Sequence, residues 1–204
     1  MKAPFDFVIE PKGNRYNNTK KVGDKNLIVN TEIFNHQFVN REAIVKSIPT
    51  AYETKIKPGD IVVVHHNVFR RWHDMQGNEK NSRSYFNENT YLVKEDQIFL
   101  YKRPQAWTRF KESFWSALDG YCFVQPIKQR DKLKQGEEEQ CIGIVKYTDG
   151  VNKVGDLVGF TPFSTYEFII DGQRLYRVLN KFITIKYEYQ GDEEAYNPSW
   201  AQSS

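Results

Sequence analysis

The residues best suited to holding a metal ion are three histidines and an aspartate. His65 and His66 are adjacent, and His73 is followed directly by Asp74. Metal ligands must converge on one point. Adjacent residues of a strand point to opposite faces, so we expect the side chains of His65 and His66 to diverge. The pattern therefore predicts no metal site.

Catalytic chemistry has little support from residue types and spacing. The sequence contains no Ser-His-Asp order, Gly-rich phosphate loop or HExxH pattern that stands out. Glu53 and Asp60 do not have a spacing that suggests acid–base work. We therefore expect a protein that is not an enzyme and binds no cofactor of its own.

An apolar triplet in a polar stretch is better suited to binding another protein. Leu27-Ile28-Val29 follows a polar run from Lys12 to Asn26 and precedes Asn30. Each of these side chains would contribute about 1.5–3 kcal/mol if buried in a partner's groove. The alternative is an ordinary strand that continues through Ile33-Phe34.

A second segment, from Val68 to Asn89, combines basic with aromatic residues, which can stack on single-stranded nucleic acid. The chain has 29 basic and 26 acidic residues, and the two signs alternate along it. A protein that binds phosphates usually concentrates its basic residues on one face. We therefore expect a surface loop that packs on its own module or on a neighbouring subunit, and no nucleic-acid partner. The residues concerned are Arg70, Arg71, Trp72, Arg83, Tyr85 and Phe86.

Cysteine usage and hydropathy indicate the compartment. Cys122 and Cys141 are far apart and form no CxxC pair, so we expect buried free thiols in a reducing environment. No stretch resembles a signal peptide, and no run approaches the ~20 apolar residues that span a bilayer. We expect a soluble, cytoplasmic protein without a membrane partner.

Four segments of the first half recur in the same order in the second half. The offset between matched residues falls from 115 to 85 along the chain, so the second copy has lost residues between the matched segments. Loops change length in this way on a shared scaffold, because surface insertions cost little stability. The matches are Phe7–Pro11 with Cys122–Pro126, Ala43–Lys46 with Gly143–Lys146, Lys57–Val62 with Lys153–Val158, and Tyr91-x-Val93-x4-Ile98 with Tyr176-x-Val178-x4-Ile183.

Each matched segment is typical of a strand. Ile61–Val64 is a short apolar run after the turn signal Pro58-Gly59-Asp60, in which Gly permits positive φ and Asp accepts bonds from nearby amides. Asp171-Gly172 separates two apolar runs and predicts a hairpin. Many short strands with little helix predict an all-β protein built from two small barrels.

The domain boundaries follow from the repeat. We expect a barrel with a long loop and an insertion at 1–103, a linker at 104–116, a shorter barrel at 117–190 and a flexible polar tail at 191–204. Four apolar residues at three- and four-residue spacing predict a short helix at the linker. They are Trp107, Phe110, Phe114 and Leu118.

The turn and the hairpin after it resemble those of the GroES-type co-chaperonin family. The shared pattern is [VP]-G-D-x-V, then a hairpin that ends in Y-x-V-x4-I. It reads Pro58–Val63 in the first copy and Val154–Phe160 in the second. The resemblance spans about 5–102 and 117–188, which is most of the chain.

This resemblance implies a function. Members of the family form rings of small barrels that cap a chaperonin, and each subunit docks through an apolar tripeptide on a flexible loop. It implies that the loop runs here from Lys12 to Arg41, and that Leu27, Ile28 and Val29 bind the apical domains of a GroEL-type chaperonin. It also implies a homo-oligomeric ring that assists ATP-dependent protein folding, with ATP bound by the chaperonin and not by this chain.

The second copy departs from this pattern. Its loop, Lys128–Gln140, is charged and lacks an apolar triplet, and only Tyr147–Asn152 separates its next two strands. Two further interpretations follow. One is a divergent, virus-encoded form that acts in the host cytoplasm. The other is a GroES-like structural or assembly protein of a larger particle, without chaperonin contact.

Overall fold

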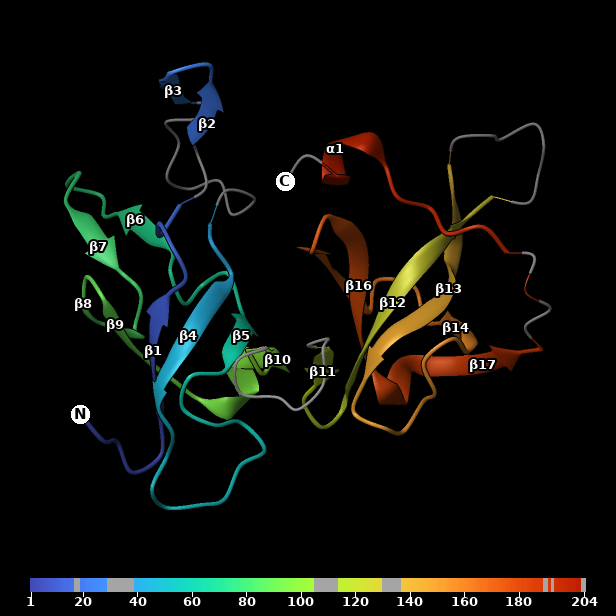
Figure 1. Cartoon of the computed structure of the whole chain (residues 1–204), viewed down its shortest axis with the longest axis horizontal. Helices are drawn as coiled ribbons and strands as arrows, with labels where there is room; N and C mark the ends of the chain where they lie inside the picture. The colour runs from blue at the N-terminus through green and yellow to red at the C-terminus, as the bar shows by residue number, and fades with distance from the viewer. Residues whose placement is uncertain are drawn as a thin grey trace. The chain divides into compact units, whose positions relative to one another are not determined.

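The computed structural model describes residues 1–16, 19–28, 39–104, 114–129, 137–188, 191 and 193–202. The chain divides into two compact units, Met1–Trp115 and Ser116–Ser204. Antiparallel strands dominate both units, which confirms the predicted all-β class (Figure 1).

The first unit is built on one large sheet and two separate hairpins. The sheet order within this unit is β10-β5-β4-β1-β9-β8. The short strand β11 (Trp115–Ala117) lies where the chain passes from the first unit to the second. The remaining bounds are β1 Phe7–Pro11, β2 Thr19–Val22, β3 Lys25–Ile28, β4 Glu42–Ser47, β5 Ile61–Val64, β6 Arg71–His73, β7 Glu79–Asn81, β8 Tyr85–Asn87, β9 Thr90–Val93, the 3-10 turn η2 Glu95–Gln97, and β10 Ile98–Lys102.

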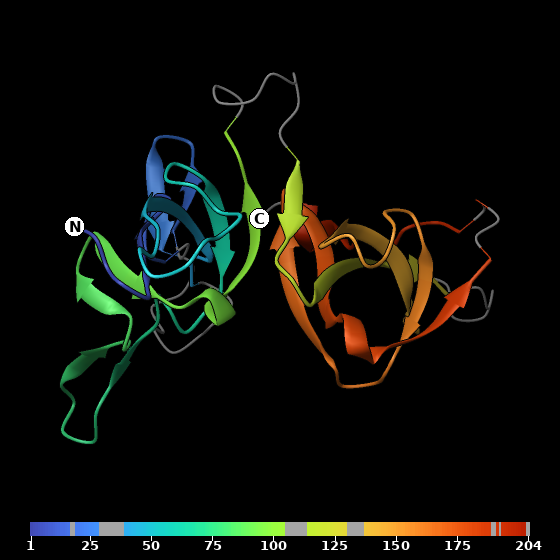
Figure 2. The ribbon, with the colours of Figure 1, turned by 90° about the horizontal axis from the view of Figure 1, so that it is seen from below.

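The second unit has a six-stranded sheet of order β15-β16-β12-β13-β14-β17 (Figure 2). Its bounds are β12 Tyr121–Lys128, β13 Glu138–Thr148, β14 Leu157–Phe160, β15 Thr165–Ile170, β16 Gln173–Leu179, the 3-10 turn η5 Asn180–Phe182, β17 Ile183–Tyr187, and the short helix α1 Ser199–Gln202. Over the described residues, the strand order of each large sheet has two ends. Closure into the two barrels that we expected is therefore not shown.

The two large sheets have the same strand order. The order β8-β9-β1-β4-β5-β10 of the first unit corresponds, strand for strand, to β15-β16-β12-β13-β14-β17 of the second. The central strand pair also has a register shift at the same step in both units. The residue pairs that flank the shift are Val8–Ser47 and Ile9–Val45 in the first unit, and Phe123–Tyr147 and Val124–Val145 in the second.

The cores of the two units use equivalent positions. Phe7, Ile9 and Val62 are fully buried in the first unit. Cys122, Val124 and Val158 belong to the core cluster of the second unit. These are the residues that the sequence comparison aligns, so the repeated segments supply the apolar face of each sheet.

The Gly-Asp turn adopts the conformation that the sequence predicts. Gly59 has a φ of 91° and Gly155 a φ of 92°. The Oδ2 atoms of Asp60 and Asp156 accept the amide N–H three residues earlier, at 2.8 Å and 2.9 Å. This bond closes the turn just before β5 and β14, so each strand starts in register with its neighbour.

A basic side chain in or just after the neighbouring strand meets each turn aspartate. Asp60 is buried, and its Oδ1 lies 3.2 Å from Nε of Arg103. Asp156 is more exposed, and its Oδ2 lies 2.7 Å from Nζ of Lys186. The hydrogen bond from Lys186 is the main cause that lowers the pKa of Asp156.

The hairpin predicted at Asp171-Gly172 is present. Ile170 pairs with Gln173 across a two-residue turn in which Asp171 has a φ of 49° and Gly172 a φ of 71°. Positive φ at both central residues matches the right-handed twist of the flanking strands.

Two expectations about the ends of the second unit need correction. The predicted linker helix is wrong over Trp115–Ala117, which form strand β11; residues 105–113 lie outside the described residues. The tail expected to be flexible is instead bound to its own unit over 193–202, through backbone bonds described below.

Replacing Gly155 with alanine tests the turn. A Cβ there would have no atom within 4 Å, so the cost comes from the positive φ alone and should be about 1–2 kcal/mol of unfolding free energy. Chemical denaturation measures it, with Val154→Ala, at an exposed neighbouring position, as the control. Equal stability of Gly155→Ala and wild type would contradict this account of the turn.

The Asp156–Lys186 pair predicts a pH dependence. Because folding lowers the pKa of Asp156, its contribution is present above the unfolded pKa and is lost as pH falls through the folded value. The stability gap between wild type and Asp156→Asn should therefore be widest near neutral pH and close below about pH 4. Urea titrations at several pH values measure the gap. A gap that is the same at all pH values would refute the ionic contribution.

Candidate functional site

The β2–β3 hairpin carries the described part of the predicted docking triplet. Val22 pairs with Lys25 across a turn at Gly23-Asp24, where Gly23 has a φ of 61°. Leu27 is 58% exposed, so it does not belong to the core of its unit. Ile28 is the last residue of β3, and Val29 lies outside the described residues.

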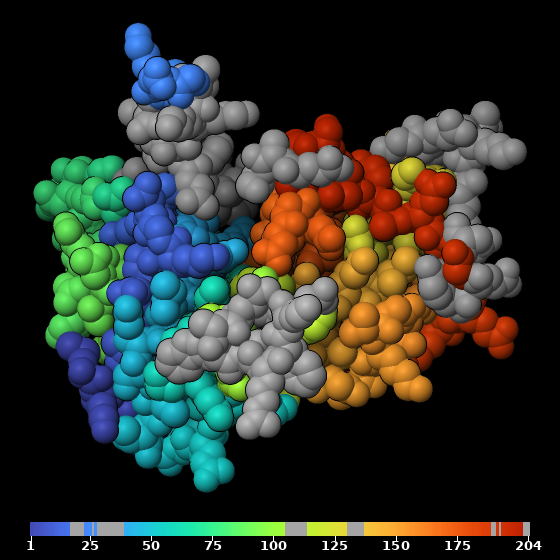
Figure 3. Space-filling model, in the orientation of Figure 1, coloured from blue at the N-terminus to red at the C-terminus, as the bar shows by residue number. Residues whose placement is uncertain are grey.

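Figure 1 places this hairpin beyond one end of the large sheet of its unit, and Figure 3 shows the space-filling view. We call residues 17–38 the arm. The segment is a strand where it is described, as one of the two interpretations of the sequence has it, yet Leu27 remains open to a partner.

The residues that flank the arm meet in a pair of backbone contacts, which we call the neck. Tyr16 and Val39 form an isolated antiparallel bridge, and both are buried. The amide of Asn40 donates to the carbonyl of Arg15 at 3.1 Å. The neck therefore consists of Arg15, Tyr16, Val39 and Asn40.

The buried side chain of Asn40 forms hydrogen bonds with backbone groups next to the neck. Its Nδ2 donates to the carbonyl oxygens of Lys12 and Asn14, at 3.0 Å and 2.9 Å, and its Oδ1 accepts the amide of Glu42 at 2.9 Å. Buried polar groups are costly unless bonded in this way. Asn40 thus fixes the point where the chain leaves β1 and the point where it returns to β4.

The neck is also bonded to the segment between β5 and β6. Nε of Arg15 donates to the carbonyl of Phe69 at 2.7 Å, and its Nη2 donates to that of Arg70 at 3.3 Å. The amide of Arg71 donates to the hydroxyl oxygen of Tyr16 at 2.7 Å, and the Arg71 guanidinium lies 5.0 Å from the Tyr16 ring centroid.

The guanidinium of Arg15 covers two tyrosines of the sheet. It lies 5.5 Å from the ring centroid of Tyr91 and 5.4 Å from that of Tyr85, within the range of cation–π attraction. Burial lowers the pKa of Arg15 and raises the pKa of Tyr91, but the guanidinium stays charged.

Sequence reasoning missed the roles of Arg15 and Tyr16, because both lie in the stretch Lys12–Asn26 that reads as polar and loose. The available signal was Tyr16, the only aromatic residue in that stretch. A lone aromatic in a polar run has an apolar body that needs to be covered.

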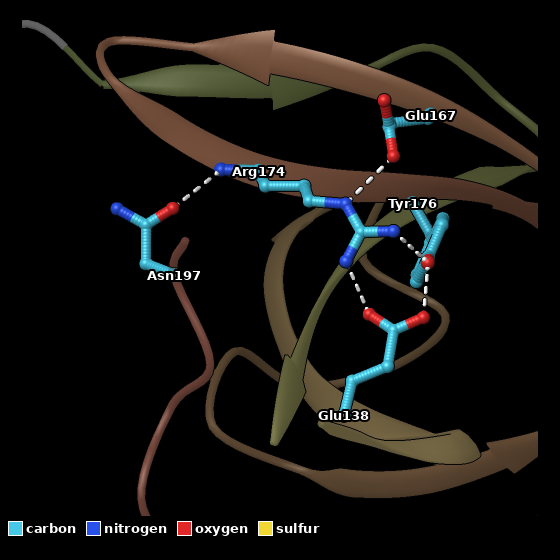
Figure 4. A network of polar contacts seen from close by, with 5 residues as sticks. All are labelled: Glu138, Glu167, Arg174, Tyr176 and Asn197. Carbon is cyan, nitrogen blue, oxygen red and sulfur yellow. Dashed lines mark hydrogen bonds and ion pairs between the residues drawn. The ribbon is translucent and has the colours of Figure 1, made fainter. Parts of the chain in front are cut away.

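The equivalent end of the second unit is closed by a side-chain network (Figure 4). Tyr176 is the counterpart of Tyr91, and the Arg174 guanidinium lies 5.0 Å from its ring centroid. Nε of Arg174 is 2.6 Å from Glu167, and Arg174 and the Tyr176 hydroxyl both donate to Glu138. Burial, followed by the bond to Glu138, raises the pKa of Tyr176.

Glu138 is the first residue of β13, where the chain returns from the loop that corresponds to the arm. At the base of that loop the amide of Gln129 donates to the carbonyl of Glu137 at 3.0 Å. Residues 130–136 lie outside the described residues. Both units therefore place an arginine over the same tyrosine. In the first unit that arginine comes from the neck, and in the second from β16.

The C-terminal segment completes this end of the second unit. The amide of Lys128 donates to the carbonyl of Glu194 at 2.8 Å, and that of Tyr196 donates to the carbonyl of Pro126 at 2.7 Å. Asn197 accepts the amide of Arg174 at 3.0 Å. The first two bonds satisfy backbone groups of β12 beyond its pairing with β16, and the third satisfies an amide of β16, which explains why the tail is not loose here.

The histidines do not behave as expected of neighbours on a strand. β5 ends at Val64, so His65 and His66 lie in the following turn, and their rings stack at a centroid distance of 4.3 Å. Asp74 accepts the amides of Gln76 and Asn78, which closes the β6–β7 turn. Over the described parts of the chain, no group of three or more His, Cys, Asp or Glu residues could hold a metal ion.

The two cysteines are free thiols, but only one is fully buried. Burial raises the pKa of Cys122 to about 12, so its thiol is protonated and inert at neutral pH. Cys141 is partly buried, and burial raises its pKa as well. The prediction of buried free thiols is therefore confirmed for Cys122 and only in part for Cys141.

Comparisons with known proteins supply no relative: neither the protein-family models nor the curated proteins contain a match to this chain. No helix in the described ranges has the length and apolar character needed to cross a membrane.

Removing the Glu138 carboxylate tests the network of the second unit. Glu138→Ala leaves the largely buried Arg174 and Tyr176 without their shared acceptor and should cost about 1–3 kcal/mol of unfolding free energy. Chemical denaturation measures it, and Glu137→Ala, at the exposed preceding position, is the matched control. The network would be unimportant for stability if the two variants unfolded alike.

Proposed function

We propose that the chain is a co-chaperonin of tandem GroES-like modules that caps a chaperonin ring. Its first module would dock on the apical domains through Leu27, Ile28 and Val29, and the chaperonin would bind and hydrolyse ATP. The observation that carries this proposal is the exposed Leu27 on an arm whose two ends are fixed at the neck.

The duplicated architecture supports the proposal. The repeated strand order and the shared Gly-Asp turn fit the pattern that resembles the co-chaperonin family. The asymmetry also fits, because the end of the second module that corresponds to the arm is tied down by Glu138 and the C-terminal segment. In this proposal one module binds the chaperonin and the other acts as a spacer within the ring.

Self-association has support from an outer strand. β17 is an end strand of its sheet, and its Ile185 and Tyr187 are 48% and 40% exposed. Exposed apolar residues on an end strand favour pairing with another chain. The same feature would serve the alternative function, a ring-forming assembly protein of a larger particle that makes no chaperonin contact.

Charge placed on the arm should abolish docking. Leu27→Asp removes an apolar contact worth about 1.5–3 kcal/mol and should weaken chaperonin binding about tenfold or more. Size-exclusion chromatography with light scattering, with chaperonin and ATP, measures complex formation. Val151→Asp, at a similarly exposed apolar position in the second unit, should bind as wild type does.

The outcomes separate the two functions. Co-elution that Leu27→Asp abolishes and Val151→Asp preserves supports the co-chaperonin. A wild-type oligomer that never shifts the chaperonin peak rejects the co-chaperonin and supports the assembly protein.

A further inference from the structure

The connection between the third and fourth equivalent strands along the chain is much longer in the first unit than in the second. In the second unit, residues 161–164 join β14 to β15. In the first unit, residues 65–84 join β5 to β8 and include the β6–β7 hairpin. The unit with the long connection is also the one that carries the arm.

The long connection is built as a firm support. Val68 and Phe69 are fully buried, and the Ser82 hydroxyl donates to the carbonyl of Val68, which closes the base of the insertion. Asp74 closes the turn at its tip, and the Asn78 backbone amide is the main donor that lowers the pKa of Asp74. Contacts within the insertion therefore hold the backbone groups that face the neck, independently of the arm.

We infer that this insertion is a brace that holds the neck, and that Arg15 and Tyr16 are the residues that position the arm. Three polar contacts cross between neck and insertion: two from the Arg15 guanidinium and one from the Arg71 amide to Tyr16. The brace thus contacts Arg15 and Tyr16, which precede the arm. The Tyr16–Val39 bridge and the hydrogen bond from the Asn40 amide then hold the residues that follow the arm.

A braced neck has a consequence for binding. A loop held at a fixed base loses less conformational freedom on docking than one that moves freely, so binding is stronger for the same contacts. The brace itself does not depend on the proposed function, whereas its effect on chaperonin affinity does.

Amide hydrogen exchange measured by NMR tests the brace directly. Tyr16→Phe keeps the ring but removes the acceptor for the Arg71 amide. The Arg71 and Asn40 amides should both exchange about fivefold faster or more, as expected for one lost hydrogen bond. The Val45 amide lies away from the neck and donates to the carbonyl of Asp60 at 2.9 Å. This amide should stay protected, which shows that the unit is still folded.

A matched substitution controls for the loss of a tyrosine hydroxyl. Tyr52→Phe removes a hydroxyl from a half-buried tyrosine elsewhere in the same unit and should leave the Arg71 and Asn40 amides unchanged. Unchanged exchange of the Asn40 amide in Tyr16→Phe would overturn the inference, because the neck would then be held without the insertion.

Binding then distinguishes failure of the brace from failure of the proposed function. Tyr16→Phe should weaken chaperonin affinity by up to about fivefold, with Leu27 intact. If Leu27→Asp abolishes binding but Tyr16→Phe changes neither exchange nor affinity, the brace fails and the co-chaperonin stands. If no variant or wild type binds, yet the Asn40 amide exchanges faster in Tyr16→Phe, the brace stands and the co-chaperonin fails.

Discussion

Both units depend on the same backbone constraint, the positive φ of the glycine in the Gly-Asp turn. At Gly59 and Gly155 the chain turns so that the next aspartate can accept an amide of the same turn. The turn is also bonded to the preceding strand, because the Gly59 and Gly155 amides donate to the carbonyls of Val45 and Val145. This geometry sets the register of the sheet, and the core positions follow from the register.

On this common scaffold the two units differ at one end of the sheet. There, each has a tyrosine that needs cover, Tyr91 or Tyr176, and each covers it with a guanidinium. Arg15 reaches Tyr91 from the neck and donates hydrogen bonds to carbonyl oxygens of the insertion. Arg174 reaches Tyr176 from its own strand and bonds to carboxylates. The same packing requirement therefore fixes the neck in one unit and the start of β13 in the other.

The sequence was sufficient to predict the strands of the repeated segments and of the Asp171-Gly172 hairpin, because their signals are local, but not β2 or the strands β6 to β8 of the Val68–Asn89 segment, which was expected to be a loop. Alternating or continuous apolar runs, the Gly-Asp turns and Asp171-Gly172 each determine backbone conformation over a few residues, and all these elements are present. The linker helix was wrong at Trp115–Ala117 because helical spacing of apolar residues says nothing about an available strand partner. The prediction of a flexible tail was wrong because the tail forms backbone hydrogen bonds with Pro126 and Lys128, which are far away in the sequence.

The same reasoning explains what was missed at the candidate site. The exposure of Leu27 agrees with an apolar residue in a polar run, a property that the sequence displays. The neck is different, because Arg15 and Tyr16 find their partners 54 and 55 residues away, in backbone carbonyls and an amide that no side-chain pattern reveals. Contacts of a side chain with distant backbone depend on the fold and not on residue type. Once the sheet is formed, however, the same arginine that covers Tyr91 must also fix the neck, because both its hydrogen bonds end on the insertion. Core packing and the presentation of the arm are thus one interaction in this unit.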